Sequence, residues 1–140
     1  MSTVHRSPFT VHCLPFTLST LLLLAGAARG TEYFVATNGL DSNSGADWTQ
    51  PLRTIGAGVA IATNSGDIVT VSNGTYTITS QIVITNAITV RSFMDGLSGA
   101  SNTIVQVNQA YGGRVFSNGN ANAAIAGLTI RGGYGRSVVG

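Results

Sequence analysis

From residue 67 onward, apolar and polar positions alternate with a period of two in short runs rich in β-branched residues. This alternation is typical of half-buried β-strands, and Asn and Gly separate the runs as turn residues do. The runs cover residues 68–71, 78–84, 88–90, 104–107, 115–116 and 125–130. No helical pattern appears among them, so the sequence predicts an all-β body over residues 67–140.

A helical pattern occurs once, before these strands. Leu52, Ile55, Val59 and Ala62 recur at spacings of three and four, which predicts an amphipathic helix of about 12 residues. Pro51 is acceptable at its first position. Residues 29–66 are therefore predicted to form an N-terminal strand, a loop and this helix, whose apolar stripe packs against the strands.

Three apolar pairs among the strands share one alternation and are expected inside the fold: Val69 with Val71, Ile88 with Val90, and Leu128 with Ile130. The first interval is 19 residues and the second is 40. The intervals indicate a repeat near 20 residues, and the longer one is either two turns or one turn enlarged by the loop at residues 93–101.

Asparagines follow several of the strands, at positions 73, 86, 108 and 118. Asn tolerates positive φ and can turn the chain as a single residue. This placement favours a stack of parallel strands over a β-sandwich.

The first 28 residues carry an export pattern. An apolar run over residues 18–28 follows Arg6 and ends in small residues, which predicts a signal peptide cleaved after Ala27 or Ala28. A membrane anchor needs about 20 apolar residues, and Pro8 and Pro15 bracket a shorter run. We therefore expect a secreted or cell-surface protein with no membrane span after cleavage.

Removal of residues 1–28 limits the available chemistry. His5, His12 and Cys13 are the only His and Cys residues, and the chain has no Lys. Nucleophilic triads and zinc sites are therefore not expected, and neither is any cofactor. Six arginines then face five acids, a net charge too small to indicate nucleic-acid binding.

The chain resembles the opening of right-handed parallel β-helix proteins of the pectate-lyase-like superfamily. The resemblance rests on residues 33–35, 38–45, Trp48, residues 51–55 and 66–76, and on the later stretch 127–133. It implies a solenoid with one short N-terminal capping α-helix, in which Leu52, Ile55 and Val59 cover the first turn. Residues 67–140 would be the first turns, truncated at the C-terminus.

The acidic residues do not form a recognisable site. Asp41 to Gly45 could hold calcium, but the spacing fails the EF-hand pattern, and a turn fixed by Asp and Asn is the alternative. Asp41, Asp47, Asp67 and Asp95 are scattered through loops and turns, so no paired carboxylates are placed for hydrolysis. We predict no catalytic and no metal-binding residue, and expect Asp67 to anchor its turn.

Arg91 and Arg131 are the predicted substrate-binding residues. Each follows the apolar pair of a strand unit, so we expect both to point outward from one sheet and to stack. Their planar forks could pair with acidic groups of a polymer, or they could only solvate the strand face. Trp48 and Tyr76 could stack on sugars or pack at strand ends.

The predicted function is the N-terminal scaffold of an exported β-helix protein that binds or degrades extracellular polysaccharide. The enzyme, if the full-length protein is one, would be a polysaccharide lyase or a glycoside hydrolase. The alternative is a non-enzymatic cell-surface adhesin or structural stalk. The resemblance itself transfers no catalytic residue, since its members include both kinds of protein.

Overall fold

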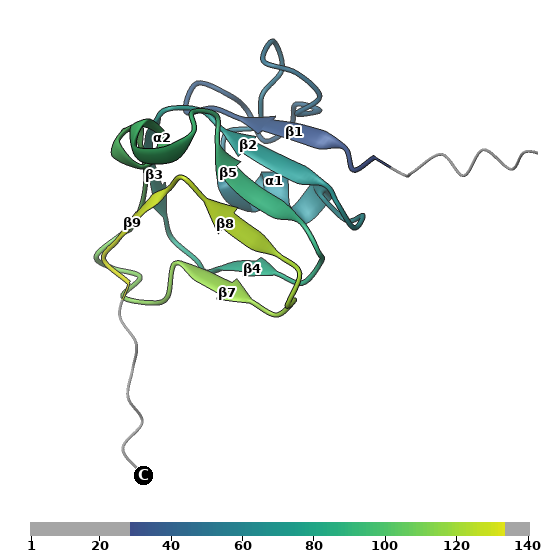
Figure 1. Cartoon of the computed structure of the whole chain (residues 1–140). Helices are drawn as coiled ribbons and strands as arrows, with labels where there is room; N and C mark the ends of the chain where they lie inside the picture. The colour runs from purple at the N-terminus through teal and green to yellow at the C-terminus, as the bar shows by residue number, and fades with distance from the viewer. Residues whose placement is uncertain (1–28, 134–140) are drawn as a thin grey trace, which may run out of the picture.

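The computed structural model describes residues 29–133, so the predicted signal peptide at 1–28 and the segment 134–140 lie outside the described residues. The elements of the described part (Figure 1) are β1 (Glu32–Val35), α1 (Ile55–Ile61), β2 (Ile68–Val71), β3 (Gly74–Ile78), β4 (Ile82–Ile84), β5 (Thr89–Ser92), α2 (Gly96–Asn102), β6 (Thr103–Val107), β7 (Phe116–Asn118), β8 (Ala124–Ala126) and β9 (Thr129–Arg131). None of its helices is long and apolar enough to cross a membrane.

The strands form three sheets in which every pair is parallel. Sheet A has the order β1-β2-β5-β8, sheet B the order β3-β6-β9, and sheet C the order β4-β7. From β2 onward the chain visits the three sheets in turn and then returns to sheet A. The predicted parallel pairing is therefore confirmed.

The core lies between the sheets and is built from side chains in register. On sheet A, Val69 of β2 pairs with Val90 of β5, which pairs with Ile125 of β8. Val69 and Val90 are fully buried. Val105 of β6 is also fully buried and pairs with Tyr76 of β3. Burial of each aliphatic side chain contributes roughly 1.5–3 kcal/mol, so these columns carry most of the stabilisation.

Helix α1 covers one end of this core, as predicted. It packs against β1, β2 and β4, and Leu52, Ile55 and Val59 are buried in the core. Gly58 permits the close approach, because a Cβ there would lie 2.8 Å from a methyl group of Val69. The helix is shorter than predicted, because Leu52 forms a parallel bridge with β1 and the helix begins only after it.

The predicted repeat interval is wrong. Val69 is in register with Val90, 21 positions later, and Val90 is in register with Ile125, 35 positions later. The connections between strands differ in length, so a single interval cannot describe them. Ile130 belongs to sheet B, opposite Val105, and is 49% exposed, contrary to its predicted interior position. Leu128 is half-buried.

Two further predictions need correction. The loop at residues 93–101 contains a second helix, α2, which the sequence pattern missed because its only buried residue is Gly99 and it has no apolar stripe. The turn asparagines do not adopt positive φ; among the described residues every positive φ belongs to a glycine, including Gly74 and Gly127. Glycine adopts this region without the steric cost that Asn still has, so the turns use Gly where both are nearby.

Asp67 anchors the start of β2, as expected. Its side chain is fully buried. Its Oδ1 accepts a hydrogen bond from the backbone N–H of Thr31 at 2.7 Å, and its Oδ2 accepts one from the backbone N–H of Asn64 at 2.9 Å. The carboxylate thereby ties the segment before β1 to the turn before β2.

We predict that Asp67→Ala lowers the free energy of unfolding by about 3 kcal/mol, because two backbone donors lose their acceptor. Asp67→Asn keeps one acceptor oxygen and should cost less. Urea denaturation followed by circular dichroism measures both. Asp95→Ala is the control, since that side chain forms no capping hydrogen bond. An equal effect of Asp67→Ala and Asp95→Ala would contradict the anchoring role.

We also predict that Val90→Ala destabilises the chain by about 2 kcal/mol, because it leaves a cavity in the middle of the sheet A column. Val83 of β4 is 51% exposed, so Val83→Ala should change stability by less than about 0.5 kcal/mol. Thermal or urea unfolding compares the two. Similar losses from both variants would show that the column does not carry the core.

Candidate functional site

The outer face of sheet A is the candidate functional site. Because Val69 and Val90 point inward, the neighbouring residues on the same strands point outward. Phe34 of β1, Thr70 of β2 and Arg91 of β5 are in direct register there. Three adjacent parallel strands thus present an aromatic ring, a hydroxyl and a guanidinium side by side, about 4.8 Å apart along the backbone.

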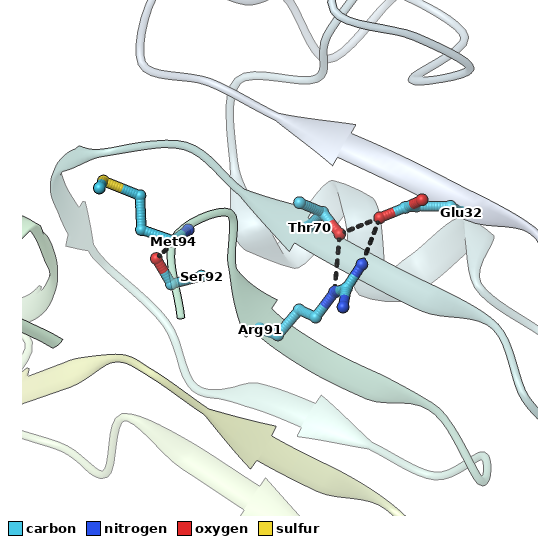
Figure 2. A network of polar contacts seen from close by, with 5 residues as sticks. All are labelled: Glu32, Thr70, Arg91, Ser92 and Met94. Carbon is cyan, nitrogen blue, oxygen red and sulfur yellow. Dashed lines mark hydrogen bonds and ion pairs between the residues drawn. The ribbon is translucent and has the colours of Figure 1, made fainter. Parts of the chain in front are cut away.

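Glu32 joins this row through a polar network (Figure 2). Its Oε1 accepts a hydrogen bond from the Thr70 hydroxyl at 2.5 Å and another from Arg91 Nη2 at 2.9 Å. Arg91 Nε donates to the Thr70 oxygen at 3.3 Å. The Arg91 and Glu32 side chains are 42% and 37% exposed, so each has further hydrogen-bonding capacity that faces solvent.

The network lowers the pKa of Glu32. The largest cause is the hydrogen bond from the Thr70 hydroxyl, which favours the ionised carboxylate. Partial burial opposes it, and the hydrogen bond and positive charge of Arg91 act in the same direction as Thr70. Glu32 is therefore ionised at neutral pH and compensates the charge of Arg91.

An aromatic cluster borders the network. Trp48, from the loop after β1, lies with its ring centroid 4.7 Å from that of Phe34, at an interplanar angle of 57°. It meets Phe93, just after β5, edge to face at 5.2 Å. Trp48 is 39% exposed and Phe93 is 59% exposed, so large aromatic surfaces remain open beside the charged pair.

Local hydrogen bonds hold these aromatic residues in place. Asp47 Oδ1 accepts from the backbone N–H of Thr49 at 2.7 Å and forms the turn that contains Trp48. These hydrogen bonds from Thr49 lower the pKa of Asp47. After β5, Ser92 points inward and its hydroxyl accepts from the backbone N–H of Met94 at 3.2 Å (Figure 2). This turn leaves Phe93 on the outer side.

The structure separates the two predicted substrate-binding arginines. Arg91 lies on β5 of sheet A, whereas Arg131 lies on β9 of sheet B in register with Gln106. The expectation that both point from one sheet is wrong, because the connections that place Ile125 in sheet A carry the chain on to sheet B by residue 129. Arg91 does point outward, as expected, but it is already paired with Glu32.

The other predicted aromatic candidate lies in the core. Tyr76 is 6% exposed, and its hydroxyl lies 3.0 Å from the Ser72 side chain and donates to the Val35 carbonyl oxygen at 3.4 Å. Burial raises the pKa of Tyr76. Of the alternatives for this residue, packing is the one observed.

The Asp41 loop makes structural contacts. Asp41 Oδ1 accepts from the backbone N–H groups of Arg53 and Thr54 at 2.9 and 2.8 Å, and its Oδ2 accepts from the Thr54 hydroxyl at 2.9 Å. Both carboxylate oxygens are thus used to join the loop to the start of α1. Within residues 29–133, no three His, Cys, Asp or Glu side chains are grouped closely enough to hold a metal ion.

Sequence reasoning missed Glu32, Phe34 and Phe93 as parts of this face. Their only sequence signal is the alternation within β1 and β5, and it becomes informative once the register that aligns these strands is known. Comparisons with known proteins add no assignment: no family model, curated protein or solved structure matches the chain.

We predict that Thr70→Val raises the pKa of Glu32 more than Arg91→Gln does, because the Thr70 hydrogen bond is the largest cause of the lowering. NMR titration of the Glu32 carboxyl carbon measures both. The network stabilises the fold above the ordinary Glu pKa of about 4.3 and loses that effect as the pH falls through the lowered folded value. Glu32→Gln should therefore flatten this acid-side decline.

The change in stability should stay below about 1 kcal/mol, because the pair is partly exposed and screened by solvent. A larger pKa change from Arg91→Gln than from Thr70→Val would contradict the assigned order of causes.

Proposed function

We propose that the chain is the N-terminal scaffold of an exported right-handed parallel β-helix protein of the pectate-lyase-like superfamily. Three observations support this proposal: all strand pairs are parallel, the chain visits sheets A, B and C in turn, and α1 covers one end of the core. A repeated strand–turn coil produces this order of sheets, whereas hairpin-built sandwiches produce antiparallel pairs.

The proposed activity of this scaffold is binding of extracellular polysaccharide at the outer face of sheet A. The observation that carries it is the open aromatic pair Trp48 and Phe93 beside the Glu32–Arg91 pair. A sugar ring has an apolar C–H face and a rim of hydroxyl groups. Aromatic rings accommodate the apolar face, and charged groups exchange strong hydrogen bonds with the hydroxyls.

The charge balance indicates the kind of sugar. Arg91 is compensated by Glu32 at 2.9 Å, so the face has little net attraction for an anionic polymer. Both groups keep exposed atoms that can donate to and accept from neutral hydroxyls. We therefore propose neutral sugar units as the ligand of this face.

The proposal assigns binding, and no bond cleavage, to this segment. Four of the five acidic side chains accept hydrogen bonds that organise the fold: Glu32, Asp41, Asp47 and Asp67. Each is therefore committed to a local contact, and none is paired with a second carboxylate as glycoside hydrolysis requires.

We predict that Trp48→Ala weakens binding of neutral oligosaccharides roughly tenfold, because the aromatic platform is lost. Trp48→Phe should retain part of the affinity. Tyr111→Ala, in the loop after β6, is the matched aromatic control and should have no effect. Isothermal titration calorimetry against a panel of neutral oligosaccharides measures all three. If no oligosaccharide binds, or if Trp48→Ala binds as tightly as the unchanged chain, the adhesin or stalk alternative is favoured.

A further inference from the structure

A cavity of about 390 Å³ lies between the start of α1 and the outer side of β3. This volume is in the range of small-ligand sites. Its hydrogen-bonding lining consists mainly of hydroxyl-bearing side chains together with one cation: Arg53, Thr37, Thr54, Thr75, Thr77 and Thr79. The cavity is thus distinct from the aromatic face of sheet A in both place and chemistry.

Arg53 is the charged group of this cavity, and its guanidinium is available. Its backbone N–H is held by Asp41, which fixes the residue at the cavity wall. Its side chain forms no ion pair within the described part of the chain, where the recorded pair is that of Arg91 with Glu32. Arg53 is exposed, so its planar fork can reach a ligand without first breaking an internal contact.

The polar lining continues from the cavity across the outer face of sheet B. Thr75 and Thr77 face outward from β3 because Tyr76 between them is buried. Thr77 is in register with Gln106 of β6, which is in register with Arg131 of β9. Gln106 Nε2 donates to the Thr77 hydroxyl at 3.1 Å. A polar track therefore joins the cavity to Arg131, about 10 Å from Thr77 along the backbone.

We propose that this track binds an acidic glycan, with a sulfate or carboxylate group at Arg53 and uncharged hydroxyls along Thr75, Thr77 and Gln106. Sulfate and carboxylate share the oxygen geometry that a guanidinium fork pairs with. Arg131 at the far end of the track receives a second anionic group. This inference rests on the proposed function in taking the ligand to be a glycan, but it assigns a different face and an opposite charge preference.

One acidic side chain lies near the track. Asp41 contacts Thr54 and the backbone of Arg53, so its negative charge disfavours an anionic group beside Thr54. The remaining cavity wall along β3 carries hydroxyls only, apart from apolar and backbone atoms. The anionic group is therefore directed to the guanidinium, and the neutral part of the ring to the threonines.

The test is calorimetric titration of the full chain with three oligosaccharides of matched length: one sulfated, one uronate-containing and one neutral. We expect an acidic oligosaccharide to bind to the track, and Arg53→Gln to weaken that binding roughly tenfold, the value of one charge-assisted hydrogen-bonded contact. Thr77→Val and Arg131→Gln should each weaken it by a smaller factor. The sulfated and uronate arms show which anionic group is preferred.

Arg114→Gln is the matched control, because Arg114 is exposed and lies outside the cavity lining. Equal losses from Arg53→Gln and Arg114→Gln would overturn the site, since they would indicate attraction by net charge alone. Failure of both acidic oligosaccharides to bind would also overturn it. Trp48→Ala should leave acidic binding unchanged, so failure of the track and failure of the proposed neutral-sugar face are distinguishable.

Discussion

The structure depends on the in-register parallel stacking of apolar side chains on sheet A. Val69, Val90 and Ile125 occupy successive strands at one register position, and their burial against α1 and the other sheets fixes which side of each strand faces inward. A slip of one residue would turn every side chain of a strand to the other face. The composition of the outer face is therefore a consequence of the core: once Val69 and Val90 point inward, Thr70 and Arg91 must point outward.

The two outer faces differ because of what surrounds their arginines. On sheet A, Arg91 is held by Glu32 and Thr70, so its charge is compensated and its geometry is fixed. At the edge of sheet B, Arg53 has its backbone held while its guanidinium is open. One fold thus presents a neutral face next to exposed aromatic rings and a second face with uncompensated positive charge. The first suits neutral sugars and the second suits anionic groups, and a single extended glycan with both kinds of unit could contact both.

The sequence predicted those features that depend on local pattern. Alternation located β2 within its observed bounds, and the spacing of Ile55 and Val59 identified the helix that covers the core. It did not predict the register, because connections of unequal length separate strands with the same alternation; Ile130 was therefore assigned to the wrong sheet. Helix α2 was missed because it buries only Gly99 and has no periodic stripe. The candidate site could be predicted only as far as the outward direction of Arg91, since the partners that compensate it come from strands that only the register brings together.

The most direct test of the account is NMR mapping of the bound neutral oligosaccharide on the full chain, with amide, indole and arginine Nε resonances assigned. The account predicts that the largest shifts occur at the Trp48 indole, the backbone of Phe93 and the Arg91 Nε–H, with small changes on β3 and β6. Shifts concentrated on β3, β6 and Arg53, or a uniform absence of shifts at ligand saturation, would contradict the claim that the core register builds a sugar-binding face on sheet A.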